Sequence, residues 1–354
     1  MQYPNDRKVI VVGAGPGGLT AGMILASKGF NVEIFESKDR VGGRNAGFKL
    51  GDFIFDTGPT FLMMKFILKD MFELAGRRIE DYLEIIEVDP MYRLSYADGT
   101  EFFPSHKNRD WTIDQIEELF PGNGVGYLKF LQREGIKYER LAPCLEVPYE
   151  HKSDLLSKRL RHAAPYLDAH VNLFQNLRRY YDDERLKIAF TFQTKYLGMS
   201  PWECPALFGI ISYIEHSGGI WHPIGGLHKI SEAMAQIIEE DGGKINLSTS
   251  VDEVLVKDGN ATGIRLESGD IVEGDYVFIN ADFGYAINNL IKPENLDSWS
   301  PEVVSKKRLS CSTFMLYLGV DKTFDNIPHH NIIFPEDYKR NVTEIAEEKV
   351  LSDQ

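Results

Sequence analysis

The sequence predicts an α/β protein built on a parallel β-sheet, and three observations lead to this prediction. A β-branched block, Val9 to Val12, is followed at once by a G-x-G-x-x-G pattern and then by a helical apolar pattern that runs to Ala26. A second apolar block, Val32 to Phe35, ends at Glu36. Farther along, residues 250–274 alternate apolar and polar side chains between turn signals. Because buried parallel strands are continuous apolar blocks, the first two observations indicate a Rossmann-type βαβ unit.

The glycine-rich turn has the residue types that a dinucleotide requires. Gly13 permits a tight turn, Gly15 lets backbone N–H groups approach a pyrophosphate, and Gly18 lets the helix pack on the strand. The carboxylate of Glu36 can bond ribose hydroxyls and would repel a 2′-phosphate, which argues against NADP. A glycine turn with a purely structural role is the alternative. The cofactor-binding residues predicted in this unit are Gly13, Ala14, Gly15, Pro16, Gly17, Gly18 and Glu36.

The eighteen residues 9–26 carry no charge, so hydropathy alone would also indicate a membrane span. Five of the six residues from Gly13 to Gly18 are glycine or proline, which is wrong for a spanning helix. The run is therefore predicted to be a strand, a turn and a helix.

Two further motifs follow Glu36. Gly42 and Gly43 allow a second close approach of backbone to a phosphate, and Arg44 offers a fork of donors suited to a diphosphate or a carboxylate. An apolar strand, Phe53 to Phe55, then leads into the turn Asp56-Thr57-Gly58-Pro59-Thr60. For the last three residues of that turn, a plain surface turn is the competing interpretation.

In this order and spacing, "VGAGPGGL", Glu36, "VGGR" and "FDTGPT" resemble the amino-terminal half of the phytoene desaturase (carotenoid desaturase) branch of the FAD-dependent amine oxidase superfamily. The resemblance implies a Rossmann-type FAD-binding domain (GR2-like, a parallel sheet with a β-meander) and an α+β substrate domain with a helical lid. It implies FAD as the cofactor, and it adds to the binding residues Gly43, Arg44, Gly58, Pro59 and Thr60.

A second part of the resemblance begins with an aromatic-rich helix that leads to the turn Trp221-His222-Pro223-Ile224-Gly225-Gly226. His222 stands where the family usually has Tyr, which bears on substrate identity. The helix after this turn should pack back on the flavin domain. The resemblance also implies that Val251 contacts the adenine through its backbone and that Asp282 belongs to the cofactor site. His222 is a candidate base, with Glu215 and His216 behind it, and a structural role is the alternative for each.

The chain divides, by prediction, into four segments. Residues 1–86 form the first part of the FAD-binding domain, 87–215 a substrate and lid domain, 216–290 the second FAD-binding part, and 291–354 a return to the substrate domain. Helices are expected from Trp111 to about Lys195, with breaks at 121–124, Pro143 and Pro148. The resemblance also implies strands of a substrate-domain sheet in the stretches 309–324 and 328–341. The resemblance implies a further carboxy-terminal glycine-rich segment that is not in this sequence, so we expect either a fragment or a partner that supplies it.

Residues 152–179 carry six basic residues against two acidic ones, beside regularly spaced leucines. Such a basic amphipathic segment can lie on an anionic membrane surface, and an ordinary solvated helix is the equal alternative.

Composition excludes some classes of protein. The net charge of −14 argues against nucleic-acid binding, which depends on Lys and Arg. Cys144, Cys204 and Cys311 are widely spaced and indicate neither disulfides nor a zinc site. His329 and His330 are adjacent, so on a strand they would point to opposite faces, and no metal is predicted. No secretory signal is evident, and a cytoplasmic protein, peripheral on a membrane, is expected.

The function implied by the resemblance is FAD-dependent desaturation of an apolar polyene precursor, such as phytoene or diapophytoene, with a hydride passing to the flavin. One alternative is another flavin oxidase of the superfamily, acting on amines or porphyrinogens. The other is a lipid-binding escort protein of the same fold without redox chemistry.

Overall fold

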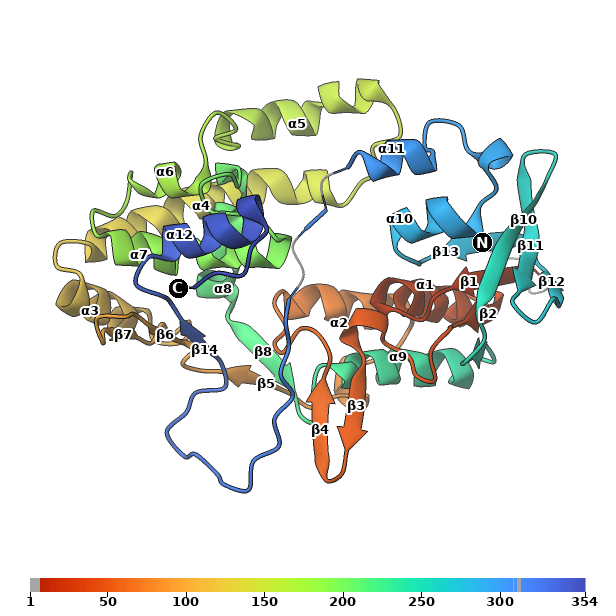
Figure 1. The fold of residues 1–354 in the computed structure, drawn as a ribbon, viewed down its shortest axis with the longest axis horizontal. Helices are drawn as coiled ribbons and strands as arrows, with labels where there is room; N and C mark the ends of the chain where they lie inside the picture. The colour runs from red at the N-terminus through yellow and green to blue at the C-terminus, as the bar shows by residue number, and fades with distance from the viewer. Residues whose placement is uncertain (1–6, 308, 311–312, 354) are drawn as a thin grey trace. The chain divides into compact units, whose positions relative to one another are not determined.

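The computed structural model describes residues 7–307, 309–310 and 313–353 (Figure 1). Contacts within the chain define two compact units. Unit 1 comprises Met1–Ile86 and Trp221–Arg308, and unit 2 comprises Glu87–Ile220 and Leu309–Gln354. The first unit is thus assembled from two segments that are separated in sequence by most of the second.

A four-stranded parallel sheet forms the centre of unit 1. Its strands are β1 (Lys8–Val12), β2 (Asn31–Phe35), β9 (Lys244–Asn246) and β13 (Tyr276–Ile279), in the order β13-β1-β2-β9. Helix α1 (Pro16–Ser27) connects β1 to β2. The strand, the turn and the helix divide the uncharged run as predicted, and the parallel sheet confirms the fold class.

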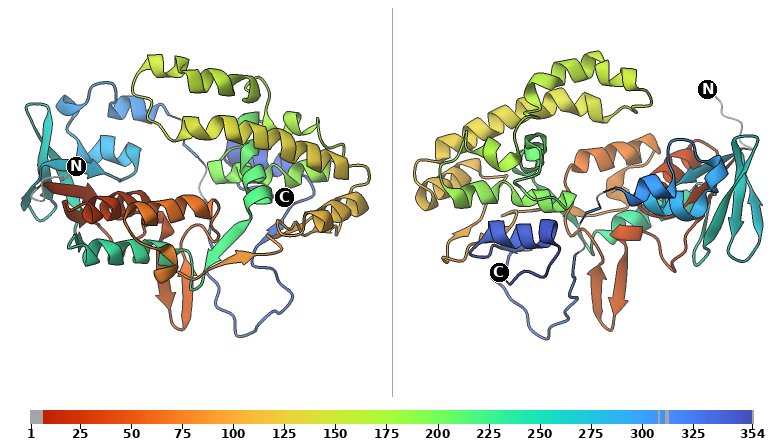
Figure 2. Two further views of the ribbon diagram at one scale, coloured as in Figure 1. Left: turned by 180° about the vertical axis from the view of Figure 1, so that it is seen from behind. Right: turned by 45° about the horizontal axis from the view of Figure 1, so that its top comes forward.

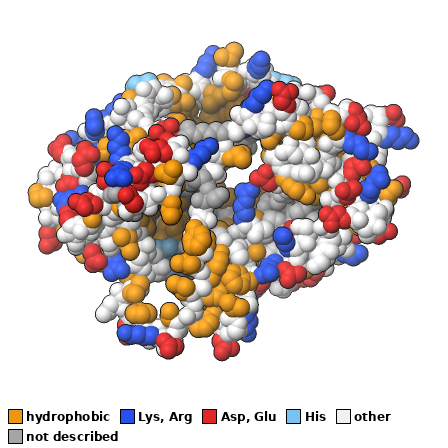
Figure 3. Space-filling model, viewed as in Figure 1, with side chains coloured by type: hydrophobic (Ala, Val, Ile, Leu, Met, Phe, Trp, Pro, Cys, Tyr) orange, Lys and Arg blue, Asp and Glu red, His pale blue; other side chains and the backbone are white. Residues whose placement is uncertain are grey.

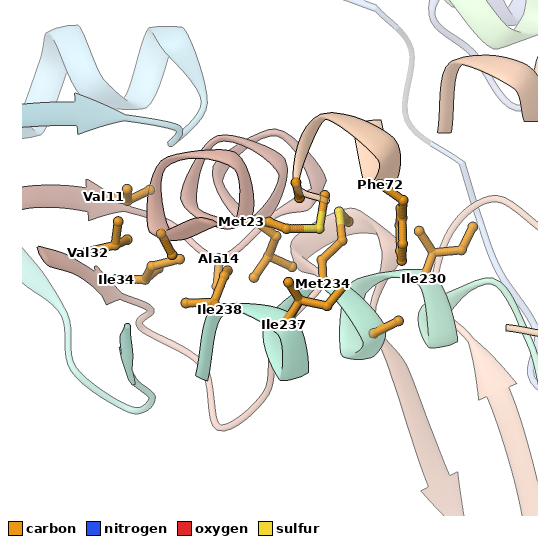
Figure 4. Close-up of a cluster of buried hydrophobic side chains, with 14 of the residues drawn as sticks. Val11, Ala14, Met23, Val32, Ile34, Phe72, Ile230, Met234, Ile237 and Ile238 are labelled. Carbon is orange, nitrogen blue, oxygen red and sulfur yellow. The ribbon is translucent and has the colours of Figure 1, made fainter. Parts of the chain in front are cut away.

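Alternate side chains of β1 and β2 face two different layers. Val11, Val32 and Ile34 pack against α1, α2 (Lys65–Leu74) and α9 (His228–Glu240), where Met23, Phe72, Met234, Ile237 and Ile238 complete one core (Figure 4). Each of these side chains, when fully buried, contributes roughly 1.5–3 kcal/mol of transfer free energy. Helix α9, which follows the Trp221–Gly226 turn, packs on α1 as expected.

The β-meander covers the other face of the sheet. It consists of β10 (Val251–Lys257), β11 (Asn260–Leu266) and β12 (Ile271–Glu273), all antiparallel (Figure 2). Ile10, Val12 and Phe35 pack here with Val254 and Ile264. The meander predicted from period-two alternation is confirmed.

A two-stranded hairpin, β3 (Gly47–Leu50) and β4 (Phe53–Asp56), follows the Gly42-Gly43-Arg44 motif. Its exposed apolar residues are Leu50, Phe53 and Ile54. Hydrophobic side chains gather over this hairpin on the face seen in Figure 3. The remaining helices of unit 1 are α10 (Phe283–Tyr285), α11 (Pro301–Ser305), the 3-10 helices Gly43–Asn45, Ile79–Asp81 and Pro293–Asn295, and the π-helix Ala286–Leu290.

Unit 2 is mostly helical. Its small sheet has the order β14-β6-β7, formed by β14 (Asn331–Ile333), β6 (Arg93–Ser95) and β7 (Glu101–Phe102). The α-helices are α3 (Arg109–Leu119), α4 (Gly124–Leu145), α5 (Lys158–Ala163), α6 (Leu173–Leu177), α7 (Glu184–Ala189), α8 (Gly209–Gly218) and α12 (Tyr338–Thr343). Short 3-10 helices span Lys152–Leu156, Ala164–Tyr166, Phe192–Leu197 and Ala206–Phe208, and a π-helix spans Glu344–Glu348. Strands β5 (Ile85–Val88) and β8 (Ile220–Pro223) lie where the chain passes between the units.

Three local predictions are wrong. Pro143 does not break a helix but lies inside α4, two residues before its end, where its missing N–H removes only the hydrogen bond to the Glu139 carbonyl. Residues 152–179 do not form one amphipathic helix. They form the 3-10 helix Lys152–Leu156, then α5, which continues directly into the 3-10 helix Ala164–Tyr166, and then α6, with non-helical residues before α5 and before α6. No strand forms over the described residues of 309–324, whereas β14 lies in the second expected stretch, 328–341, and pairs with β6. A segment cannot form a strand without a neighbouring edge to pair with.

None of the helices described has both the length and the apolar character to cross a bilayer.

Candidate functional site

A cleft of ≈ 720 Å³ lies at the carboxyl ends of β1, β2 and β13 in unit 1. Ligands of open α/β sheets bind at this edge, where the strand order reverses. The cleft is lined by Val12, Gly13, Gly15, Pro16, Gly17, Phe35, Glu36, Ser37, Lys38, Gly43, Arg44, Ser250, Val251, Asn280, Ala281, Asp282, Phe283, Tyr285 and Leu290.

The glycine-rich turn forms the floor of the cleft at the amino terminus of α1. Gly13 has a φ of +100°, which favours glycine, and its N–H donates to the Phe35 carbonyl at 2.8 Å. A Cβ at Gly18 would lie 2.2 Å from the Gly13 carbonyl oxygen, so only glycine lets the helix begin this close to the strand. Because Pro16 opens α1 without a side-chain cap, the positive end of the helix dipole is left to whatever occupies the cleft.

Glu36 ties the turn to the end of β2. Its Oε2 accepts the Ala14 N–H at 2.9 Å, and its Oε1 accepts the Lys38 N–H at 2.9 Å and the Ser37 hydroxyl at 3.2 Å. The residue is 8% exposed and still lines the cleft. A carboxylate has about four acceptor positions, so these three bonds leave capacity for a ribose hydroxyl.

Arg44 and Asp282 form an ion pair in the cleft, with 2.8 Å between Nη2 and Oδ2. Their side chains are 86% and 58% exposed. The other oxygen of Asp282 accepts the N–H groups of Gly284 and Tyr285 at 3.0 and 3.2 Å, so it caps α10. The sequence predicted both residues at the cofactor site, and the structure brings them together.

Asn280 also lines the cleft, two residues before the predicted Asp282. It follows β13, and its backbone N–H donates to the Val12 carbonyl at 2.8 Å. Its side-chain amide lies directly against the glycine turn, because a Cβ at Gly17 would be 2.6 Å from its Oδ1. The signal that could have found it is its place at the carboxyl end of a strand next to β1, and the same signal applies to Lys38 after β2.

Some predicted residues lie outside the lining. Ala14 and Gly18 instead contact residues of the lining. The Ala14 N–H donates to Glu36, and Gly18 packs against Gly13. Gly58, Pro59 and Thr60 do not line the cleft. A Cβ at Gly58 would lie 2.0 Å from the Arg44 carbonyl oxygen, so Gly58 supports the backbone that carries Arg44.

Asp56 joins two motifs that are far apart in sequence. Its carboxylate accepts the backbone N–H of Leu227 at 2.9 Å and that of His228 at 3.0 Å, and it therefore caps the start of α9. Asp56 Oδ1 also lies 2.7 Å from Nδ1 of the buried His228 ring. No local sequence pattern relates Asp56 to His228, which lies 172 positions farther along the chain.

The candidate base His222 lies in β8, and its Nδ1 is 2.9 Å from the Thr60 carbonyl oxygen. A carbonyl can only accept, so Nδ1 carries the proton, and in the neutral ring the basic lone pair is on Nε2.

Glu215 and His216, the other two candidates, are buried in unit 2 on α8. Glu215 accepts from Tyr92 and Tyr196 at 3.1 Å each and from the Gln193 amide at 2.8 Å. Burial raises the pKa of Glu215 to about 7, although these three hydrogen bonds lower it. Burial lowers the pKa of His216 to about 3, and Tyr127 contacts its Nδ1 at 3.1 Å.

A second buried polar group of unit 2 is centred on Lys137, which is 0% exposed. Its Nζ lies 2.8 Å from Glu134 and 3.2 Å from Asp168, and it donates to the Ala206 carbonyl. Arg179 also contacts Asp168, at 2.9 Å. These charges are thus compensated inside the unit.

The prediction for His329 and His330 had a wrong premise. They precede β14 rather than lie in it, and their Nδ1 atoms are 2.9 Å apart, so the rings face each other instead of pointing to opposite sides. Among the residues described, no group of three or more His, Cys, Asp or Glu side chains could hold a metal ion. Cys144 and Cys204 are free and buried, and Cys311 lies outside the described residues.

The cleft fits the adenosine diphosphate part of a flavin dinucleotide by the chemistry of its donors. Arg44, the start of α1 and the turn backbone offer positive groups to a diphosphate, and Glu36 offers an acceptor to the ribose. The absence of side chains at Gly13, Gly15 and Gly17 leaves the floor open to close approach.

A family model described as flavin-containing amine oxidoreductase matches residues 16–347. The chain therefore belongs to this family. It is 45% identical over 99% of its length to a 4,4'-diapophytoene desaturase (4,4'-diapolycopene-forming) of Methylomonas sp, of which it covers 68%. A zeta-carotene-forming phytoene desaturase of Myxococcus xanthus is 36% identical over 98% of this chain, with 66% of that protein covered.

A solved structure, an oxidoreductase from Methanosarcina mazei, matches with a TM-score of 0.59 at 21% identity, covering 84% of this chain and 64% of that one. This likeness confirms the fold. The chain spans about two thirds of the length of the curated relatives that it matches. The resemblance to the carotenoid desaturase branch and the prediction of a flavin family are confirmed.

Proposed function

We propose that this chain contributes the FAD site and part of the substrate-binding region of a carotenoid desaturase that dehydrogenates an apolar polyene precursor, diapophytoene or phytoene. The observation that carries the proposal is the glycine-floored cleft with Glu36 and Arg44, in a chain 45% identical to a diapophytoene desaturase. When bound, the flavin supplies the two-electron acceptor that no side chain can provide.

The residues of the cleft have distinct roles in this proposal. Glu36 bonds the adenosine ribose and fixes the turn, and the turn backbone at Gly15 and Gly17 meets the diphosphate. Arg44 neutralises the diphosphate charge. Val251, which lines the cleft and is nearly buried, offers its backbone to the adenine.

Desaturation also releases a proton from the carbon next to the one that loses a hydride. Its acceptor is water or His222, whose protonated Nδ1 is held by the Thr60 carbonyl and whose basic nitrogen is then Nε2. Replacement of His222 by Gln tests this assignment. A base role predicts a fall in kcat that changes the pH profile, whereas a structural role lowers stability and leaves the profile unchanged.

Product analysis tests the function directly. The chain is expressed in cells that make diapophytoene and, separately, in cells that make phytoene, and the extracted polyenes are separated and their absorption spectra recorded. New conjugated products support the proposal and identify the substrate. Purified protein that is colourless, releases no flavin on denaturation and yet retains lipid would support the escort-protein alternative instead.

We also propose that unit 2 contacts an anionic membrane surface through residues 152–161, the first part of the predicted basic segment. Leu155 and Leu156, in the 3-10 helix Lys152–Leu156, are 62% and 73% exposed, and exposed Lys152, Lys158 and Arg159 lie beside them in sequence. Leu160 instead packs against the cluster of Leu141 and Ala163, so α5 is anchored while the preceding leucines point outward.

Vesicle sedimentation tests the membrane proposal. Wild-type protein should sediment with phosphatidylglycerol vesicles and much less with phosphatidylcholine vesicles. Leu155→Ser with Leu156→Ser should reduce this binding, whereas Ile271→Ser, at an equally exposed residue of β12 in unit 1, should not. Equal sedimentation of both variants would contradict the proposal.

A further inference from the structure

We propose that Asp282 holds Arg44 across the cleft as an electrostatic latch, which the diphosphate of an incoming dinucleotide releases by taking Arg44 for itself. This inference rests on the proposed FAD site. It adds a positioning role for Asp282, which acts through Arg44 rather than on the cofactor.

The geometry of the Arg44–Asp282 ion pair allows Arg44 to exchange Asp282 for a phosphate. Arg44 reaches Asp282 through one nitrogen, Nη2, and one oxygen, Oδ2, at 2.8 Å. A guanidinium can make two parallel bonds to a phosphate, so a diphosphate satisfies Arg44 better than this single bond does. Both partners line the cleft, and the exchange therefore requires no long movement of either backbone.

Exposure makes the latch weak. With the two side chains 86% and 58% exposed, water and salt screen the attraction, and pairs of this kind are among the least stabilising in proteins. The ion pair therefore keeps Arg44 near its working position without competing strongly with a ligand that carries two negative charges.

Asp282 can release Arg44 without losing its second role. Oδ1, the oxygen that Arg44 does not contact, accepts the N–H groups of Gly284 and Tyr285 and caps α10. The other charged side chains of the lining are Glu36, which is bonded to the turn, and Lys38. Asp282 is therefore the acidic group of the lining that Arg44 contacts, and its charge is the one that a diphosphate replaces.

The variant Asp282→Asn separates the two roles, because Asn keeps an oxygen for the cap and removes the charge. The affinities of FAD, ADP and adenosine are measured by calorimetric titration of flavin-free protein at low and high salt. In low salt we expect Asp282→Asn to tighten FAD and ADP by about two- to five-fold, the range for an exposed ion pair. Adenosine, which lacks a diphosphate, should be unaffected, and the gain should shrink at high salt.

Arg44→Met and the double variant Arg44→Met with Asp282→Asn complete the cycle. Arg44→Met should weaken FAD and ADP, and adding Asp282→Asn should then change nothing. Asp297→Asn, at an exposed acid elsewhere in unit 1, removes one charge without touching the latch and should match wild type.

Three results would overturn the latch. If Asp282→Asn bound FAD more weakly, Asp282 would itself be a ligand of the cofactor. If Asp282→Asn increased FAD affinity equally with and without Arg44, Asp282 would act only by repelling the diphosphate. If FAD affinity did not change, Asp282 would have no role in binding. The failure of the proposed function is distinguishable, because wild-type protein would then bind neither FAD nor ADP. Asp282→Ala, which removes the cap as well, should lower the unfolding free energy where Asp282→Asn does not.

Discussion

The two units differ in how far their charged side chains are exposed to solvent. In unit 1, Arg44 and Asp282 stay largely exposed in an open cleft, and the amino terminus of α1 has no side-chain cap. In unit 2, Lys137 and Glu215 are fully buried among partners from the same unit. The difference indicates that the cleft leaves its electrostatic interactions to a ligand, whereas Lys137 and Glu215 already have their partners inside unit 2. Substitutions in the first region should alter ligand affinity, and those in the second should alter stability.

The largest effect is expected from Lys137→Met. Removing this cation leaves Glu134 and Asp168 as buried carboxylates without their shared partner, which should cost about 3–5 kcal/mol of unfolding free energy. Urea unfolding at neutral pH measures it. Lys129→Met, on the exposed side of the same helix α4, should stay within about 0.5 kcal/mol of wild type. A similar cost for both variants would show that the buried cluster contributes no special stability.

Glu215 should make stability depend on pH. Because its pKa is raised, folded Glu215 keeps a proton that the unfolded chain has lost at the same pH. Its contribution to the unfolding free energy is therefore complete below pH 4.5 and is lost as the pH rises toward about 7. The loss should be on the order of 3 kcal/mol.

Comparison with Glu215→Gln isolates this contribution, because His216 is present in both proteins and its opposite effect cancels. Between pH 5 and pH 8, wild type should lose stability relative to the variant in urea unfolding. A difference that does not change with pH would mean that Glu215 titrates normally.

Gly18→Val tests the floor of the cleft. A Cβ there would meet the Gly13 carbonyl at 2.2 Å, so we expect a loss of roughly 3 kcal/mol, the upper range for overpacking, together with loss of bound flavin. Flavin released on denaturation and urea unfolding measure the two effects. Gly218→Ala, where no atom lies within 4 Å of the added Cβ, serves as the control. Normal flavin content in Gly18→Val would refute the tight-turn geometry.

The smallest effect on stability is expected from Arg44→Gln. Its ion pair is so exposed that the unfolding free energy should change by less than about 1 kcal/mol. Flavin affinity should nevertheless fall. Arg44→Gln would then alter ligand binding with little effect on stability, whereas Lys137→Met alters stability. A large loss of stability would mean that the cleft, like unit 2, depends on its internal ion pair.

The sequence predicted those parts of the molecule whose causes are local. The strand, glycine turn and helix from Val9 to Ala26 depend on residues that are neighbours in the chain, and so does the alternation of the β-meander. Several cleft residues, among them Gly13, Gly15 and Glu36, could be named because the turn and the end of the next strand must meet.

What the sequence could not predict depends on contacts between distant segments. The capping of α9 by Asp56 and the packing of Asn280 on the glycine turn join residues that no local pattern relates. The strands expected over 309–324 do not form among the described residues, since the resemblance that implied them does not say whether a pairing edge is available. The facing of His329 and His330 depends on where β14 begins, and strand boundaries are the least certain feature of a sequence pattern.

The discontinuity of unit 1 has a consequence for synthesis of the protein. β1 and β2 leave the ribosome early, but their sheet neighbours β13 and β9 lie beyond the whole first segment of unit 2. At ordinary translation speeds, the 244 residues that follow Phe35 up to and including Ile279 take roughly 10 to 50 seconds to be made. During that interval the nascent chain presents two apolar strands with unpaired edges, and it should therefore need chaperone protection until its second half arrives.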